Sequence, residues 1–199
     1  MARSRMLTRR DGFKHAFLLG LGMSFGFTAR RARAQKPSSN ARVLVAYFTR
    51  TGNTRVIAGQ VRRALGADLF EIMPVDPYPE DYEETVSQAE RERKAGYEPP
   101  LMATVPDLAA YDVVFLGFPI WGMTAPAVIR SFLARHDLSG KTLVPFITHG
   151  GYGLGQSLSV VAKHAPEARI LKAFSMKADQ ERQTLSQVTR WLDGVSVKP

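Results

Sequence analysis

An apolar stretch over Val43–Phe48 runs directly into a turn rich in hydroxyl side chains, and an amphipathic helical pattern begins immediately after that turn. This order predicts a β-strand, a tight turn and an α-helix over residues 53–65 that is closed by Gly66. The first N–H groups of such a helix lack partners within the helix, and the helix dipole favours a negative charge beside them. The segment is therefore suited to hold a phosphate. The alternative is an ordinary turn in which Asn53 or Thr54 caps the helix.

The residues of the turn narrow the kind of phosphate that it could hold. Gly52 lets the backbone approach a ligand closely, and the neighbouring threonines can each donate a hydroxyl hydrogen bond. The turn has one glycine and no lysine, which excludes the Walker loop and the dinucleotide-binding loop. Neutral hydroxyls suit the monophosphate ester of a larger ligand better than a metal-bound triphosphate.

The same turn resembles the Ser/Thr-x-Thr-Gly-Asn-Thr loop of the flavodoxin-like proteins, which holds the phosphate of FMN. The resemblance implies a noncovalently bound FMN and assigns this loop to its phosphate. The residues concerned are Thr49, Arg50, Thr51, Gly52, Asn53 and Thr54.

Strand and helix patterns alternate along residues 42–194 without hairpin signals, which predicts one α/β domain with a parallel sheet. We expect a flavodoxin-like, doubly wound, five-stranded parallel sheet of order 2-1-3-4-5 with helices on both faces. The continuous apolar run Val113–Leu116 is typical of a strand that is buried on both faces. The expected strands are residues 41–48, 68–73, 111–118, 141–148 and 169–175, and the expected helices are 53–65, 80–95, 125–135, 154–164 and 179–192.

Two local patterns bear on how these elements pack. Pro145 interrupts the fourth strand, which the expected order places inside the sheet, where a missing N–H is costly unless a bulge accommodates it. In the helix over residues 80–95, Tyr82, Val86 and Ala89 are spaced for one buried face.

Three loops should meet at one edge of this sheet, because the carboxyl ends of neighbouring parallel strands lie together. They are residues 49–54, 119–124 and 148–155. Trp121 offers a flat apolar face for an isoalloxazine ring, or else plugs the gap between loop and helix. Tyr152 is either a second aromatic surface or an exposed side chain. The candidate ring-binding residues are Pro119, Ile120, Trp121, Gly122, Thr148, His149, Gly150, Gly151, Tyr152 and Gly153.

The resemblance to flavodoxin-like proteins covers residues 42 to about 193 and includes the Pro-Ile-Trp-Gly and Thr-His-Gly-Gly segments. The segment Asp76–Tyr82 is similar to one short-chain branch of that family. Relatives usually carry a second tryptophan where this chain has Gly122. The resemblance implies electron transfer by FMN with no catalytic side chain. His149 is either a proton donor near the ring or a residue that fixes its loop.

Composition excludes several other classes of protein. The chain has 199 residues and 45% hydrophobic content, enough for one well-packed domain. It contains no cysteine, and its four histidines lack ligand spacing, so we expect no disulfide and no metal site. The formal charge of +9 is concentrated in residues 1–34, so the remainder has no compositional support for binding nucleic acid.

Residues 1–34 read as an export signal peptide and residues 35–41 as a linker. A basic start precedes an apolar stretch of about 14 residues, shorter than a membrane span, and Ala32-Arg33-Ala34 offers a cleavage site. Thr8–Lys14 resembles a twin-arginine signal, with one extra residue between Arg10 and Phe13. We therefore expect periplasmic export by that route, with membrane contact only through the signal. The alternatives are an uncleaved anchor and a basic disordered tail.

Two functions remain for such a flavoprotein. It could be an enzyme that reduces a small acceptor such as a quinone with NAD(P)H, or an electron carrier whose partner is a protein. Carriers of this fold usually surround the flavin with acidic residues, and residues 119–124 and 148–155 contain none. No pyridine-nucleotide motif supports the enzyme. A hydrolase is disfavoured because the Gly-x-Ser-x-Gly elbow is missing.

Overall fold

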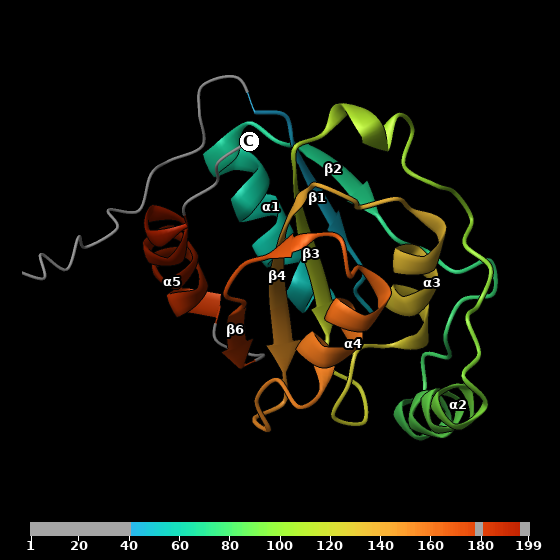
Figure 1. Cartoon of the computed structure of the whole chain (residues 1–199). Helices are drawn as coiled ribbons and strands as arrows, with labels where there is room; N and C mark the ends of the chain where they lie inside the picture. Colours follow the sequence, from blue (N-terminus) through green and yellow to red (C-terminus); the bar gives the residue numbers. More distant parts are fainter. Residues whose placement is uncertain (1–40, 178–180, 196–199) are drawn as a thin grey trace, which may run out of the picture. The chain divides into compact units, whose positions relative to one another are not determined.

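The computed structural model describes residues 41–177 and 181–195 as an α/β domain built on a single sheet (Figure 1). In chain order its elements are β1 (Val43–Tyr47), α1 (Asn53–Leu65), β2 (Asp68–Glu71), α2 (Tyr82–Ala95), a short 3₁₀ turn η1 (Leu108–Ala110), β3 (Val113–Pro119), α3 (Ala127–Arg135), β4 (Thr142–His149), α4 (Ser157–His164), β5 (Arg169–Ile170), β6 (Phe174–Lys177) and α5 (Glu181–Gly194). The helix expected at 53–65 has those bounds, and Gly66 closes it in a left-handed conformation with φ 64°.

All strand pairs of the sheet are parallel, in the order β2-β1-β3-β4-β5, with β6 also pairing with β4. The predicted fold class and the strand order 2-1-3-4-5 are confirmed. The expected fifth strand differs in one respect, because it consists of two short pieces that lie one after the other along β4.

The break between β5 and β6 explains how Pro145 is tolerated within the sheet. The N–H groups of Arg169 and Leu171 donate to the carbonyls of Lys141 and Leu143, so alternate residues of β4 direct their backbone groups to this side. Pro145 belongs to the same set, and its missing N–H therefore faces the break. The three residues 171–173 lie opposite only two residues of β4, Val144 and Pro145. The extra residue makes a β-bulge. The bulge therefore lies between β5 and β6 and not in β4. At this point the sheet needs no hydrogen bond from the backbone nitrogen of residue 145.

Helices cover both faces of the sheet (Figure 1). Helices α1 and α5 pack on one face through Val61 and Val188, and α3 and α4 pack on the other through Phe132 and Val161. Successive residues of β3 alternate between these two cores, and residues 113–116 are fully buried, as the apolar run predicted.

The face predicted for the helix over residues 80–95 is wrong. Tyr82 is 63% exposed and Val86 is 43% exposed, whereas the buried side chains of α2 are Thr85 and Glu92. The apolar spacing failed here because α2 packs at the periphery, beside α3 and not over the sheet. Its inner side therefore needs hydrogen-bonding groups, which satisfy loop carbonyls and a tyrosine.

The predicted signal peptide and nearly all of the linker lie outside the described residues. Within residues 41–177 and 181–195, none of the helices combines the length and the apolar character that crossing a membrane requires.

Close packing in the middle of the sheet gives a first testable prediction. A Cβ on Gly117 would collide with the ring of Phe146 on the neighbouring strand β4. We expect Gly117→Ala to lower the free energy of unfolding by about 1–3 kcal/mol, the usual cost of overpacking a core. Urea unfolding of the full chain, followed by circular dichroism, measures this.

Gly59→Ala is the matched control, since a Cβ there meets only the end of the Arg63 side chain, at 3.4 Å. That substitution should stabilise α1 by roughly 0.5–1 kcal/mol. Equal stability of Gly117→Ala and the unchanged chain would contradict the packing described for β3 and β4.

Candidate functional site

The three loops expected to meet do so at the carboxyl edge of the sheet, where β1, β3 and β4 end side by side (Figure 1). Residues 49–54 follow β1, residues 120–124 follow β3, and residues 150–155 follow β4. The shared edge results from parallel pairing in register, which aligns Tyr47 with Gly117 and Pro119 with Thr148.

Thr148 joins the three loops through two hydrogen bonds. Its Oγ1 lies 2.9 Å from Oγ1 of Thr54, the second residue of α1, and its carbonyl accepts the N–H of Ile120 at 2.8 Å. Thr54 is 1% exposed and Thr148 is 2% exposed, so their hydroxyl pair is shielded from water. A hydrogen bond in such a setting is costly to leave unmade, and the pair therefore fixes the start of α1 relative to β4.

The first loop leaves the N-terminus of α1 without a side-chain cap. The N-cap residue is Gly52, whose φ of 92° suits glycine, and its own N–H donates to Oγ1 of Thr49 at 3.1 Å. The Asn53 side chain donates to Oγ1 of Thr51 at 3.3 Å, and the Thr54 hydroxyl is taken up by Thr148. Capping by Asn53 or Thr54 is therefore wrong as an account of this turn.

The space beside Gly52 is open, since no atom lies within 4 Å of the place a Cβ would take. The first N–H groups of an α-helix have no carbonyl partner inside the helix. An uncapped helix start with open space before it fits a phosphate group, which would accept these N–H bonds.

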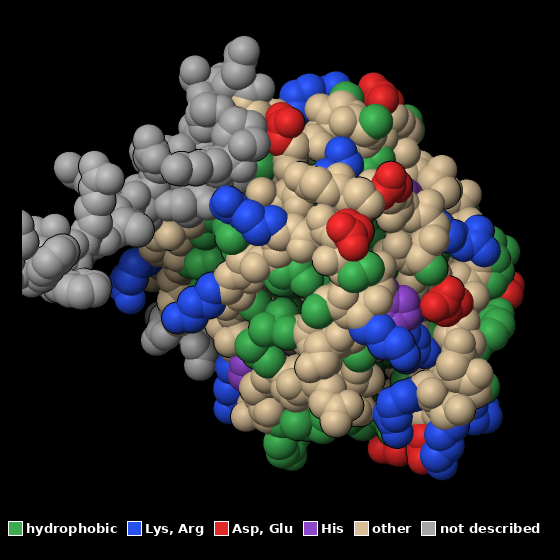
Figure 2. Space-filling view, viewed as in Figure 1, with side chains coloured by type: hydrophobic (Ala, Val, Ile, Leu, Met, Phe, Trp, Pro, Cys, Tyr) green, Lys and Arg blue, Asp and Glu red, His purple; other side chains and the backbone are tan. Residues whose placement is uncertain are grey.

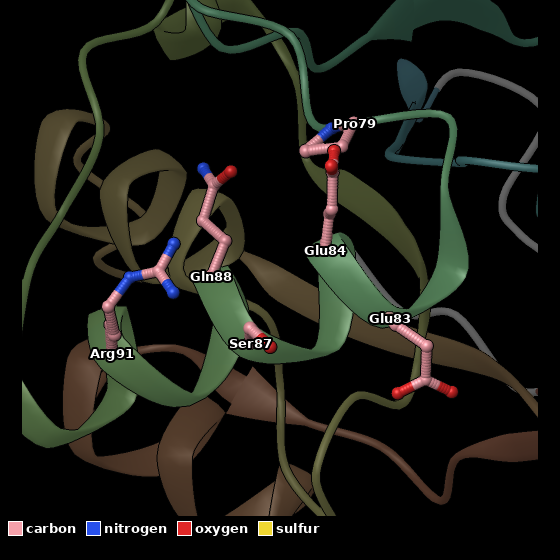
Figure 3. Close-up of a pocket in the computed structure, with 6 residues that line it drawn as sticks. All are labelled: Pro79, Glu83, Glu84, Ser87, Gln88 and Arg91. Carbon is pink, nitrogen blue, oxygen red and sulfur yellow. The ribbon is translucent and has the colours of Figure 1, made fainter.

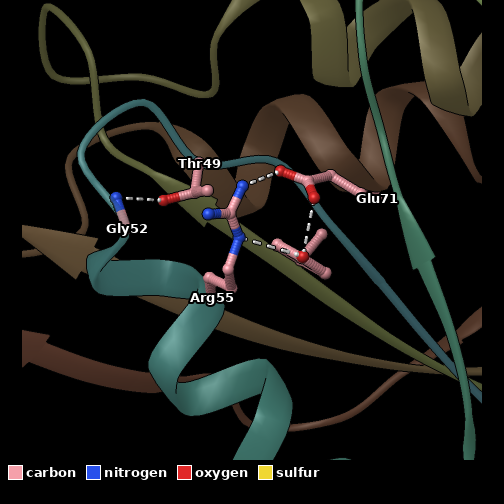
Figure 4. A network of polar contacts seen from close by, with 5 residues as sticks. Thr49, Gly52, Arg55 and Glu71 are labelled. Carbon is pink, nitrogen blue, oxygen red and sulfur yellow. Dashed lines mark hydrogen bonds and ion pairs between the residues drawn. The ribbon is translucent and has the colours of Figure 1, made fainter.

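Both arginines of the first loop region have protein partners, and binding of a phosphate by Arg50 stays a prediction. Arg50 donates to the carbonyl of Glu80 at 3.0 Å and lies over the ring of Tyr82. Arg55 pairs with Glu71 at 2.6 Å and also donates to the hydroxyl of Tyr47 (Figure 4). These contacts join the first turn of α1 to β1 and β2, and the hydrogen bond that Arg55 donates to Glu71 raises the pKa of Arg55. Burial raises the pKa of Tyr47, so its hydroxyl stays protonated.

The second loop is a tight two-residue hairpin. Trp121 and Thr124 exchange both backbone hydrogen bonds, at 3.0 and 3.1 Å, and the residues between them are left-handed, with φ of 53° at Gly122 and 63° at Met123. Two positive φ values define the turn that best matches strand twist. The Met123 carbonyl accepts the N–H of Gln156, and a Cβ on Gly155 would collide with it, so the third loop holds this hairpin in place.

Trp121 is half-buried and packs edge-on against two other aromatic rings. Its ring centroid lies 5.3 Å from that of Phe48 and 4.7 Å from that of Tyr78. These contacts are those of a hydrophobic plug between the hairpin and the end of β1. Stacking of its outer surface on a flavin ring stays a prediction.

The third loop carries its aromatic residue outward. Tyr152 is 81% exposed. Nδ1 of His149 accepts the N–H of Gly151 at 3.1 Å, so His149 does fix the fold of its loop. Because Nδ1 is the acceptor, the proton of the neutral imidazole is on Nε2. Positive φ values at Gly151 and Gly153 explain why glycine occupies those positions.

Three residues of the site neighbourhood, Tyr78, Glu92 and Arg93, were not among the candidate site residues predicted from the sequence. The Tyr78 hydroxyl donates to Glu92 on α2 at 2.8 Å, and burial raises the pKa of Tyr78. The guanidinium of Arg93 lies against Gly122, in the space that a Cβ would take. Glu92 and Arg93 read as ordinary polar positions of an exposed helix, so no sequence signal marked them.

Fold and site together define a doubly wound α/β protein. An uncapped helix N-terminus, suited to a phosphate, follows β1 at the point where the strand order reverses between β1 and β3. The family model for flavodoxin matches residues 42–195. The chain therefore belongs to the flavodoxin family.

Solved structures agree with this family membership. A Bacteroides eggerthii protein named as a candidate flavoprotein is 35% identical, with a TM-score of 0.70 over 80% of this chain and 100% of its own. A similarly named Bacteroides uniformis protein is 28% identical, with a TM-score of 0.66 over 75% and 98% of the two chains. A Lactobacillus acidophilus flavoprotein crystallised with FMN is 19% identical, with a TM-score of 0.61 over 73% and 99%, and shows a shared fold. No match was found among the curated proteins.

The hydroxyl pair gives a second prediction. Thr54→Val and Thr148→Val each remove one hydroxyl and leave the other buried without its partner. We expect each to lower the free energy of unfolding by about 1–3 kcal/mol. The double variant should lose clearly less than the two single losses combined, because it leaves no orphaned hydroxyl. Strict additivity in the urea unfolding of the four proteins would show that the two hydroxyls do not depend on each other.

Proposed function

We propose that this protein is an exported redox flavoprotein that binds FMN noncovalently and passes electrons to a small acceptor such as a quinone. The observation that carries the proposal is the uncapped start of α1 at Gly52, in a chain that belongs to the flavodoxin family. The FMN complex of the Lactobacillus acidophilus flavoprotein, which shares this fold, supports the choice of FMN.

In this proposal the first loop holds the phosphate through backbone N–H groups and the hydroxyl of Thr51, which is exposed at the turn. Thr54 acts by positioning, because its buried hydroxyl is paired with that of Thr148. The Thr49 and Thr51 oxygens each accept one hydrogen bond within the loop, so both hydroxyls keep their own proton to donate, and Thr51 is the more exposed of the two. The hairpin of residues 121–124 and the third loop flank the ring. FMN supplies reversible two-electron chemistry, and the protein supplies binding, orientation and electrostatic tuning.

The charges around the hairpin and the third loop favour a small acceptor. They do not favour a protein partner of the kind that docks on acidic residues around the flavin. The hairpin and the third loop contain no acid, Arg93 lies against the hairpin, and Lys177 lies close to Gly151. The start of α2 lies beside the first loop, since Arg50 donates to the carbonyl of Glu80, and it is acidic. Asp81 caps that helix, and Glu83 and Glu84 follow.

An electron carrier is the second candidate, and the exposed side chains of Met123 and Tyr152 favour it. Both come from loops of this edge and would be available to a protein partner.

Export is proposed from the leader. A twin-arginine route carries folded proteins, so a flavoprotein could acquire its cofactor before it crosses the membrane. The mature protein would then act in the periplasm.

The cofactor gives a third prediction. The purified protein should bind one FMN per chain, and riboflavin should bind more weakly because it lacks the phosphate. Thr51→Ala should weaken FMN by roughly 1.5–3 kcal/mol, the scale of a hydrogen bond to a charged group, and Thr51→Ser should not. Arg50→Ala should matter less, since its guanidinium is held by Glu80 and Tyr82.

Fluorescence titration of the apoprotein with both flavins measures these affinities. Riboflavin binding as tightly as FMN would remove the phosphate argument. A larger effect of Arg50→Ala than of Thr51→Ala would show that charge holds the phosphate instead.

The leader gives a fourth prediction. Replacing Arg9 and Arg10 by lysine should leave the full-length protein in the cytoplasm, because the twin-arginine receptor distinguishes guanidinium from ammonium. Replacing Arg3 and Arg5 by lysine is the matched control and should leave export intact. Cell fractionation with an antibody to the protein decides between them. Undiminished periplasmic protein in the first variant would rule out this route.

A further inference from the structure

A positively charged side chain from α2 reaches the hairpin of the candidate ring site. Nη1 of Arg93 lies so close to Gly122 that it occupies the position of the missing Cβ, and Cζ is 3.3 Å from that position. The approach is open only because residue 122 is glycine. Any larger residue would displace the guanidinium.

Two basic groups of α2 and its neighbour α3 have protein partners, whereas within residues 41–177 and 181–195 the side chains of Arg91, Arg93 and Arg135 form no hydrogen bond or ion pair. Of these three, Arg93 is the one that lies against the hairpin. Lys94 pairs with Glu90 at 2.7 Å, and Arg130 donates to the carbonyls of Glu92 and Tyr97. Within residues 41–177 and 181–195, no carboxylate forms an ion pair with Arg93. Arg93 is also exposed, so its remaining N–H groups face solvent. Figure 2 shows Lys and Arg side chains over the region of α2, with Asp and Glu side chains beside them.

The hairpin that the Arg93 guanidinium contacts is itself fixed by two sets of hydrogen bonds. Its strands are closed by the Trp121–Thr124 pair, and the Met123 carbonyl is held by the N–H of Gln156 at 2.8 Å. A non-glycine residue with φ of 63°, such as Met123, is strained and persists only where its surroundings fix it. Arg93 therefore lies beside a fixed feature of the site.

We propose that Arg93 is a specificity-determining residue that recognises an anionic group, a carboxylate or sulfonate, on the small electron acceptor. A planar guanidinium presents paired donors that match such oxyanions. Residues 119–124 and 148–155 contain no acid that could pair with this positive charge at the loops. The acid that does interact with it is Glu90 on α2 itself, whose pKa is lowered mainly by Lys94 and also by Arg93. The inference rests on the proposed function, since it takes the acceptor to approach the ring between the hairpin and the third loop.

Binding to the oxidised protein tests the inference without turnover. Naphthalene sulfonate, which accepts no electrons, is titrated into the FMN-loaded full chain, and its dissociation constant is read from the flavin absorption spectrum. Arg93→Gln should raise that constant about fivefold, the discounted effect of an exposed charge pair, and Arg93→Lys should raise it less. Naphthalene methanol, the neutral probe, should bind equally to all three proteins.

Arg91→Gln is the matched control. Arg91 lies two residues away on the same helix, but lines a shallow pocket of about 340 Å³ with Gln88 and Pro79 (Figure 3). This variant should bind both probes as the unchanged chain does. A sulfonate constant unchanged by Arg93→Gln, or changed equally by Arg91→Gln, would overturn the proposal.

A reaction provides the second readout. The protein, reduced beforehand with one equivalent of dithionite, gives two electrons and two protons to naphthoquinone sulfonate, which becomes the quinol while the flavin is oxidised. Arg93→Gln should slow this reaction severalfold and flatten its dependence on ionic strength, with little effect on unsubstituted naphthoquinone. Equal slowing of both quinones would overturn the proposal.

Failure of the proposed function would look different. A chain that holds no FMN shows no flavin spectrum, and the sulfonate titration then runs on tryptophan fluorescence, since Trp121 belongs to the hairpin. Loss of sulfonate binding in Arg93→Gln would still support the anion site. A weaker FMN affinity in this variant with unchanged sulfonate binding would assign Arg93 to the cofactor and contradict the inference.

Discussion

The buried hydrogen bond between the hydroxyls of Thr54 and Thr148 links the parts of the molecule on which the site depends. Thr54 is the second residue of the helix that follows β1, and Thr148 lies near the end of β4, with β3 between those strands. Because the Thr148 carbonyl also accepts the N–H of Ile120, the three loop-bearing strand ends share one anchor. Parallel pairing alone would bring the loops to the same edge. The anchor sets where the uncapped helix start lies relative to the other two loops.

Helix α2 adds a second support that does not belong to the sheet. Its buried Glu92 accepts a hydrogen bond from Tyr78, whose ring in turn packs on Trp121. Its next residue, Arg93, lies against the same hairpin at Gly122. The hairpin is thus contacted by α2 at Gly122 and by Gln156 at Met123. A loop fixed at two points loses little conformational freedom when a ligand arrives.

Features encoded by short-range signals were predictable from the sequence. The strand before Thr49, the bounds of α1 and its closing Gly66 follow from apolar patterning and the left-handed conformation that glycine allows. The alternation of strands and helices predicted a parallel sheet, and right-handed crossovers left few topologies, among which the order 2-1-3-4-5 was expected and is observed. A bulge near Pro145 was expected from the sequence. Its position, between β5 and β6 and not in β4, depends on how the segment 169–177 pairs with β4.

Features set by packing between distant segments were not predictable. The spacing of Tyr82 and Val86 predicted a buried face, yet α2 turns Thr85 and Glu92 inward because its neighbours there are loop carbonyls and Tyr78. The contact of Arg93 with Gly122 joins α2 to a loop that lies far along the chain, and no pattern in the sequence indicated it. Trp121 could be placed in its loop, but its edge-on packing on Phe48 and Tyr78 needed the fold.

A crystal structure of the protein with FMN tests the central claim most directly. The account predicts the phosphate at the start of α1, within hydrogen-bond distance of the backbone N–H groups that follow Gly52, with the Thr54–Thr148 bond intact. It predicts the ring between the hairpin of residues 121–124 and the loop of residues 150–155. A phosphate bound elsewhere, or a Thr54 hydroxyl that leaves Thr148 to bind it, would contradict the account.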